Sequence, residues 1–185
     1  MYHLNELFAK CIPFDKNVRG RIGGNPPKCI EEQIPDDYKF YATLVHPEKM
    51  DNMLSILVHS KFKMRIENNI YPSIAVKVIE HKYSEISSNT NKALMDIEMH
   101  SIGAYTETRD NNDYLFVKVG GEPCFFQCKD YYYKELERNN YSFFLMIDEG
   151  GYSNDLVKGT YVFAFGTLYL YKYNITGEVI AGFWL

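Results

Sequence analysis

The sequence lacks several features that mark common classes of protein. No apolar run approaches the ~18 residues that a transmembrane helix needs, and residues 1–20 lack the apolar centre of a signal peptide. Only 4 of the 185 residues are cysteine. Without an export signal, these cysteines are expected to be reduced thiols rather than disulfide partners. We therefore expect a cytoplasmic protein without a membrane segment.

An excess of positive charge is also missing. The chain has 20 Lys and Arg residues against 24 Asp and Glu residues, so its formal net charge is −4 with histidine neutral. A protein that binds duplex nucleic acid usually carries a basic excess or stripe, and a basic membrane-surface helix is absent too. This balance predicts no nucleic-acid partner and suits a protein that meets a basic partner.

The sequence motifs of common catalytic and metal sites are absent as well. The five histidines form neither HxH nor HExxH, and no serine lies in a GxSxG elbow. Cys124 and Cys128 have CxxxC spacing, but no second pair completes the four ligands of a structural zinc site. Buried free thiols are the simpler interpretation. The sequence predicts no metal and no cofactor, and it favours a protein that is not an enzyme.

Aromatic residues are the most unusual feature that the sequence does have. The chain contains 16 Tyr, 12 Phe and 1 Trp, which make up 16% of its residues. Aromatic side chains favour strands and supply large contact areas at interfaces. The apolar and charged fractions are those of an ordinary globular protein. We expect residues 1–185 to form one β-rich domain with an aromatic surface.

Two short segments of the chain match each other. Ile22–Pro26 and Val119–Pro123 both read aliphatic-Gly-Gly-polar-Pro. Each precedes an apolar run that is typical of a buried strand, YKFYATLV from Tyr38 and YSFFLMID from Tyr141. A later strand at 74–79 is matched with 162–165 and its continuation to Tyr171. The matches predict repeat halves at about 20–83 and 114–173, plus a C-terminal hairpin strand at 178–184.

The remaining pattern predicts an α+β fold with mostly antiparallel strands, arranged as a single pseudo-symmetric domain of two structural repeats. Residues 48–58 have apolar residues at helical spacing and stay ambiguous, and residues 93–100 fit either a helix or a strand. Polar residues 84–92 predict a loop. Short helices are predicted at 2–10 and 130–139, and further strands at 62–67, 72–83, 114–119 and 168–173.

The two Gly-Gly pairs are candidate anion-binding turns. Glycine permits positive φ and proline fixes φ, so each segment predicts a sharp reversal into an extended stretch. A purely structural turn is one interpretation, and a backbone N–H concavity that accepts an anion is the other. The Lys and Ser or Thr of a phosphate loop are missing, which disfavours nucleotide binding. The candidate residues are Gly23, Gly24, Gly120 and Gly121.

Acidic and tyrosine residues near the end of the second-half strand are candidate partner-binding residues. Paired carboxylates here could do acid–base chemistry, hold a cation or simply form a solvated loop. They could also meet a basic partner and speed its association. Among three consecutive tyrosines at least one is expected to be exposed and could anchor a partner. The candidates are Asp148, Glu149, Tyr152, Asp155 and Tyr132.

Several of these residues resemble a known family. Gly120–Pro123, Gln127, Tyr141–Glu149 and Phe165–Tyr169 resemble the YwqG-like family of bacterial proteins. That family shows a Gly-x-Pro turn followed by Gln, an apolar strand ending in Ile-Asp, an acidic loop, and a Gly before an aromatic strand. The resemblance covers 115–173 well and 20–48 loosely. It implies one α+β domain built from two structural repeats.

The resemblance also bears on function. Members of the family are often encoded beside secreted toxins, and some are proposed immunity proteins, so it implies a cytoplasmic toxin-neutralising partner more than an enzyme. Our first hypothesis is a non-enzymatic binding protein that neutralises a cognate toxin. The alternatives are a hydrolase-type enzyme that uses carboxylates or a Cys–His pair between the repeats, and a small-ligand or anion-binding module at the Gly-Gly turns.

Overall fold

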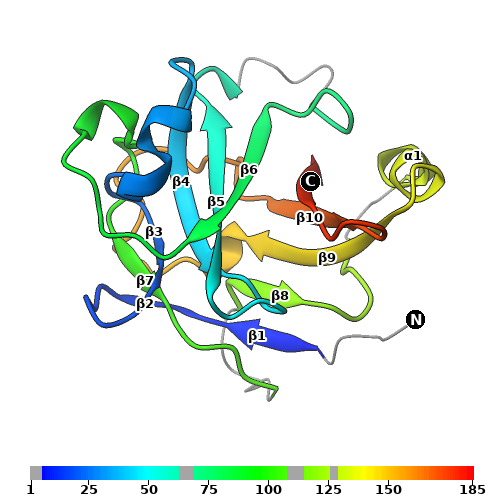
Figure 1. Ribbon diagram of the computed structural model, residues 1–185, viewed down its shortest axis with the longest axis horizontal. Coiled ribbons are helices and arrows are strands. Elements are labelled where there is room, and N and C mark those ends of the chain that lie inside the picture. The colour runs from blue at the N-terminus through cyan, green and yellow to red at the C-terminus, as the bar shows by residue number, and fades with distance from the viewer. Residues whose placement is uncertain (1–5, 63–68, 108–114, 126–128) are drawn as a thin grey trace.

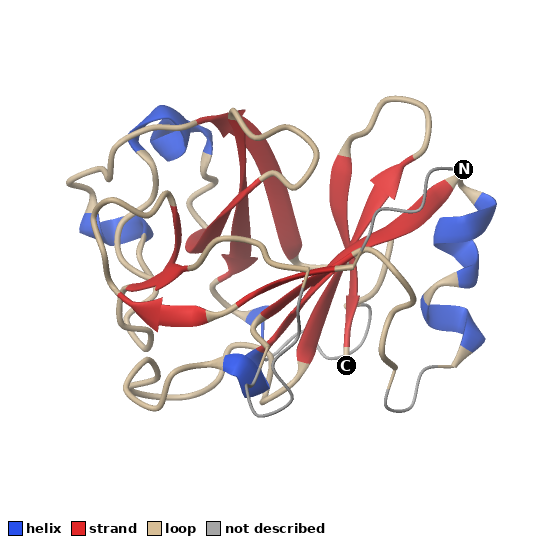
Figure 2. Cartoon of the chain, turned by 90° about the horizontal axis from the view of Figure 1, so that it is seen from below, coloured by secondary structure: helices blue, strands red, loops and turns tan. Residues whose placement is uncertain are grey.

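Two antiparallel β-sheets share one hydrophobic core (Figure 1). The computed structural model describes residues 6–62, 69–107, 115–125 and 129–185. Short helices lie on the outer sides of the sheets, as Figure 2 shows. Among the described residues, no helix has the length and apolar character needed to cross a membrane. The prediction of mostly antiparallel strands is confirmed.

The first sheet has six strands and is built mainly from the first half of the chain. The strands occur in the order β2, β7, β3, β4, β5, β6. Their bounds are β2 Cys11–Pro13, β7 His100–Ile102, β3 Gly20–Ile22, β4 Tyr38–Val45, β5 Asn52–His59 and β6 Val76–Lys82. Its outer face is covered by the 3-10 helix η1, Lys28–Gln33, through a small apolar cluster that includes Ile30 and Phe40. A second 3-10 helix, η3, spans Thr90–Lys92.

The second sheet has five strands in the order β1, β8, β9, β10, β11. Their bounds are β1 Leu7–Ala9, β8 Val117–Val119, β9 Tyr141–Asp148, β10 Thr167–Tyr173 and β11 Val179–Trp184. Its outer face is covered by η4, Asp130–Tyr132, and α1, Lys134–Arg138, which buries Leu136 in an aromatic cluster. The 3-10 helix η5, Glu149–Gly151, follows β9 directly.

The two sheets show the same local features at their first long strand. Strands β4 and β9 each contain a bulge at the fourth residue, at Tyr41 and at Phe144, where the ladder to the next strand shifts register. The carbonyl of each bulged residue accepts a 2.9 Å hydrogen bond, from the Gly23 N–H in one sheet and from the Gly120 N–H in the other. Each sheet thus contains four neighbouring antiparallel strands, β3 to β6 in one and β8 to β11 in the other. In both sets, a Gly-Gly pair follows the first strand.

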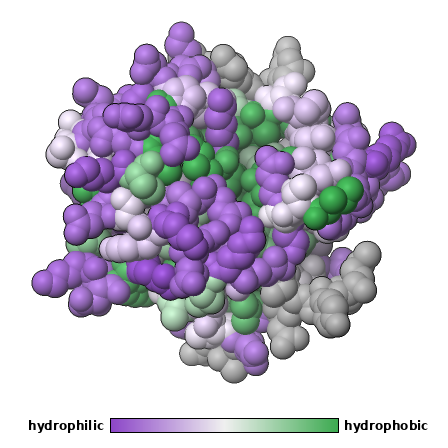
Figure 3. Space-filling view, viewed as in Figure 1, coloured by the Kyte–Doolittle hydropathy of each residue, from purple (hydrophilic) through white to green (hydrophobic). Residues whose placement is uncertain are grey.

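The shared core lies between the inner faces of the sheets. Alternation along the strands sends Ile22 and Leu44 inward from one sheet and Leu145 and Leu168 inward from the other. All four side chains are buried. One core therefore holds both halves of the chain together. On the face drawn in Figure 3, some hydrophobic residues also reach the surface between hydrophilic regions.

Several sequence predictions need correction. The helix at 2–10 is wrong, because Leu7–Ala9 pairs with β8 as a strand, and 48–58 contains strand β5. The strand at 162–165 is also wrong, because Ala164 and Phe165 have positive φ in a turn. The sequence also matched residues 74–79 with the segment that contains β10. Strand β10 lies directly beside β9, whereas residues 76–79 belong to β6, which β5 separates from β4.

Other predicted elements are confirmed. They are the strands that became β4, β6, β8 and β9, the helical segment at 130–139, and the terminal hairpin. Residues 63–67 of the predicted strand at 62–67 lie outside the described residues, as does Gln127.

Replacing Gly23 by alanine tests the first Gly-Gly turn. Its φ is +72°, and an added Cβ would lie 2.5 Å from the Glu98 carbonyl oxygen, which is backbone and cannot move aside easily. We expect Gly23→Ala to lower the free energy of unfolding by about 3 kcal/mol. Gly177→Ala is the control, since its φ is +79° with open space around it, and should cost about 1 kcal/mol. Urea denaturation measures both. Equal losses would contradict the close approach at Gly23.

Candidate functional site

A buried arginine on the outer face of the first sheet is the centre of the candidate site. Strand β3 places Gly20 and Ile22 on the inner side and Arg21 on the outer side. The Arg21 side chain is only 5% exposed. Its Nη1 donates to the Gly23 carbonyl at 2.7 Å and its Nη2 to the Asn25 carbonyl at 2.5 Å. The guanidinium carbon lies 4.6 Å from the centre of the Phe40 ring.

The Arg21 charge has no carboxylate partner within the described parts of the chain. Burial lowers the pKa of Arg21 to about 10, so the group is still a cation at neutral pH. Carbonyl oxygens solvate a cation but do not neutralise it. An uncompensated buried charge is costly, which makes this position unusual for a structural arginine.

A pocket of about 80 Å³ opens beside Arg21, and we call it the Arg21 pocket. Two further cations, Lys16 and Arg19, lie in its wall. Its other polar lining residues are Thr43, His81, Tyr83 and Ser84, and its apolar lining residues are Phe14, Val18, Pro27, Met53 and Ile86. The pocket therefore combines positive charge and hydroxyl groups with apolar side chains.

Thr43 lies directly opposite Arg21 in the β3–β4 ladder. The residue is 3% exposed, and its Oγ1 has no hydrogen-bond partner among the described residues. Buried polar groups are nearly always hydrogen-bonded, so an orphan hydroxyl needs an explanation. Thr43 Oγ1 can donate to a group that enters the pocket.

His81, Ser55 and Cys29 form a hydrogen-bonded group next to the pocket. His81 Nε2 lies 2.7 Å from Ser55 Oγ, while Nδ1 lies 2.6 Å from the Lys82 carbonyl oxygen and 3.2 Å from Cys29 Sγ. A carbonyl only accepts, so Nδ1 carries the proton. Burial lowers the pKa of His81 and favours the neutral ring. Nδ1 therefore cannot take the Cys29 proton, which disfavours a Cys–His nucleophile here.

Lys118 occupies the matching position in the second sheet. It is the middle residue of β8, and its Nζ donates to the Glu122 carbonyl as Arg21 donates to that of Asn25. Lys118 also forms a 2.9 Å ion pair with Glu6. Two corresponding cations are thus held by the turn after a Gly-Gly pair, and a carboxylate accompanies Lys118 but not Arg21.

Two of the four predicted anion-binding glycines, Gly23 and Gly120, use their N–H groups within the sheets. The N–H groups of Gly23 and Gly120 donate to strand carbonyls, so neither is available to a ligand. Gly24 lies against the Met99 side chain, and Gly121 against the Glu6 side chain. The first turn instead contributes carbonyl oxygens that hold Arg21.

The acidic candidate Glu149 is buried, which corrects its assignment to a partner-binding surface. It is 1% exposed. Its carboxylate accepts hydrogen bonds from the N–H groups of Phe163 at 2.9 Å and Phe165 at 2.8 Å and from the Tyr152 hydroxyl at 3.1 Å. The Tyr152 hydroxyl also lies 2.5 Å from that of Tyr41, so this chain of contacts fixes the loop after β9.

The other acidic and tyrosine candidates lie apart from the Arg21 pocket. Asp148 is half-buried and accepts from the Gly150 N–H at 2.8 Å. Asp155 is exposed and lies 2.9 Å from His100 Nε2. Tyr132 packs against Phe183 on the outer face of the second sheet. Cys124 is exposed and Cys128 lies outside the described residues.

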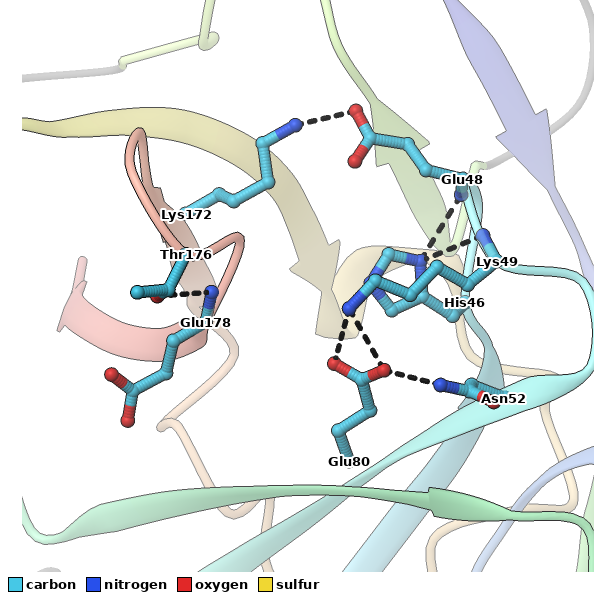
Figure 4. Close-up of polar contacts among 8 residues, drawn as sticks. All are labelled: His46, Glu48, Lys49, Asn52, Glu80, Lys172, Thr176 and Glu178. Carbon is cyan, nitrogen blue, oxygen red and sulfur yellow. Dashed lines mark hydrogen bonds and ion pairs between the residues drawn. The ribbon is translucent and has the colours of Figure 1, made fainter.

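A second polar cluster lies where the sheets face each other, drawn in Figure 4. His46 Nδ1 accepts from the backbone N–H groups of Glu48 at 3.1 Å and Lys49 at 3.2 Å. Lys49 pairs with Glu80, and Lys172 from β10 pairs with Glu48 across the sheets. The charged side chains pair with one another and tie the two sheets together, while the buried His46 Nε2 has no hydrogen-bond partner among the described residues. Across the described chain, no three potential metal ligands come together.

Replacing Thr43 by valine tests whether its hydroxyl is an orphan. Valine keeps the shape and removes the unpaired buried group, so we expect Thr43→Val to raise the free energy of unfolding by about 1 kcal/mol. Ser55→Ala removes a buried hydroxyl that has a partner, His81, and should lower it by about 1 kcal/mol. Urea denaturation without added anions measures both. A loss in the Thr43 variant would show that the hydroxyl is paired.

No family model matches the chain, and no curated protein matches it. The resemblance to the YwqG-like family thus stays a prediction from the sequence motifs.

Proposed function

We propose that this protein is a non-enzymatic binding protein that holds an anionic group of its ligand in the Arg21 pocket. The observation that carries the proposal is a guanidinium that is buried, cationic and without a carboxylate partner in the described chain. A buried cation gains most from an anion that also accepts hydrogen bonds. A carboxylate or phosphate group meets both conditions.

The rest of the pocket suits the same ligand. Thr43 is paired with Arg21 in the β3–β4 ladder, and its hydroxyl can donate to an anion. Lys16 and Arg19 add positive charge to the pocket. Cations around a concave site raise the local concentration of anions and speed their association. The proton on His81 Nδ1 disfavours the Cys–His form of the hydrolase alternative.

We also propose that the chain contains two structural repeats. Matching strand order, the bulges at Tyr41 and Phe144, and the carbonyl bonds made by Arg21 and Lys118 support this interpretation. In a duplicated unit, Glu6 beside Lys118 shows how the equivalent charge can be neutralised from within the chain. The first half leaves that role to a ligand.

The toxin-neutralising hypothesis is a special case of this proposal. A protein partner could supply the anionic group through an acidic side chain or its C-terminal carboxylate. The burial of Glu149 removes part of the support for an acidic interface on this chain. The Arg21 pocket is therefore the better place to test for a ligand.

Titration with inorganic phosphate and with acetate, followed by amide chemical shifts, tests the proposal. We expect shifts in residues 16–21 and 81–86, and about fivefold weaker phosphate binding in Thr43→Val, the loss of one hydrogen bond worth ~1 kcal/mol. Arg19→Gln should weaken binding further and reduce its salt dependence. Lys118→Gln is the matched control and should bind like the unaltered protein. Equal weakening in the Lys118 and Thr43 variants, or no binding, would refute the proposal.

A further inference from the structure

We infer that the ligand is an anionic amphiphile, a small molecule whose acidic head enters the Arg21 pocket and whose apolar tail lies in an adjoining groove. This inference rests on the proposed function. The groove has a volume of about 480 Å³. We call it the Met50 groove, and its apolar lining includes Leu7, Val45, Pro47, Met50, Ile102 and Tyr105.

The pocket and the groove are neighbours. Val18 and Arg19 line both of them, so the two cavities adjoin each other at this short segment before β3. A ligand that spans this segment has one end at a cationic site and the other at a largely apolar one. A molecule with one anionic end and one apolar end matches this arrangement of the two cavities.

Exposed apolar side chains gather around these two cavities. Eight large hydrophobic residues of the described chain are exposed, and four of them line the pocket or the groove. These four are Phe14, Met50, Tyr83 and Ile86. Apolar residues exposed together, rather than singly, mark a surface that is covered by something else.

The sizes favour a small molecule over a polypeptide. The Arg21 pocket, at about 80 Å³, is far smaller than a small-molecule site and suits only a head group, whereas the Met50 groove, at about 480 Å³, is in the range of such sites. The neighbouring strands β3 and β7 both lie inside their sheet with partners on each side. These two strands offer no free edge to which a peptide strand could add, and the edge strands β6 and β1 contribute only one lining residue each, His81 and Leu7.

Chain-length dependence of binding tests the inference. Acetate, hexanoate and octanoate would be titrated by calorimetry below the concentrations at which they aggregate, with octyl phosphate and octanol as comparisons. We expect affinity to rise up to about fourfold per added methylene, which corresponds to ~0.8 kcal/mol of burial. Octanol should bind far more weakly than octanoate because it lacks the charge that Arg21 requires. Octanoate and octyl phosphate distinguish the two possible head groups.

Variants of two exposed methionines separate the groove from the pocket. Met50 is 57% exposed in the groove and Met95 is 83% exposed away from both cavities. Met50→Gln should reduce octanoate affinity at least threefold and leave acetate and phosphate binding unchanged, while Met95→Gln should change neither.

The outcomes also distinguish the two proposals. If phosphate and acetate bind but affinity does not rise with chain length, or octanol binds as well as octanoate, the amphiphile inference is wrong and the anion site stands. If none of these probes binds, both proposals fail.

Discussion

The hydrogen bonds from the Arg21 guanidinium to the carbonyls of Gly23 and Asn25 are the interaction on which the candidate site depends. They hold a charged side chain under the first Gly-Gly turn and stack it on Phe40. Because the two acceptors are fixed backbone groups, the cation is positioned before any ligand arrives. A preorganised charge lowers the entropic cost of binding. The same burial makes the unliganded site less stable than one with an internal carboxylate.

The comparison between Arg21 and Lys118 shows how one backbone arrangement supports two electrostatic outcomes. Both cations are the middle residue of a three-residue strand, and both donate to the turn that follows. Glu6 reaches Lys118 because β1 pairs with β8 and brings the start of the described chain alongside. In the first sheet the corresponding neighbour of β3 is β7, whose residue opposite Arg21 is Ser101. Serine carries no charge, so Arg21 has none to pair with there.

Local patterns in the sequence predicted those elements that local chemistry determines. The apolar runs of β4 and β9, the helical segment near α1 and the terminal hairpin all follow from side-chain alternation and turn residues. The helix prediction at 2–10 failed because Leu7–Ala9 pairs with a strand more than 100 residues away, which periodicity cannot reveal. Glu149 was interpreted as a surface acid because its donors, Phe163 and Phe165, come from a distant part of the loop. The Arg21 pocket was missed for the same reason, although an arginine between Gly20 and Ile22 was a signal that sequence reasoning could have used.

Four buried side-chain polar atoms have no hydrogen-bond partner among the described residues, and of these only Thr43 Oγ1 belongs to a residue that lines the Arg21 pocket. Its position beside the Arg21 charge, which no carboxylate of the described chain neutralises, argues that binding, rather than stability, explains both. Arg21 and Thr43 are direct neighbours across the β3–β4 ladder, and both are buried on the same face. A carboxylate near Arg21 or a valine at position 43 would each relieve a local cost without altering the backbone. Two such costs at one point have a single physical remedy, an anion that accepts from both side chains. Stability alone would favour separate solutions, so their coincidence at the wall of one pocket points to a ligand that completes the site.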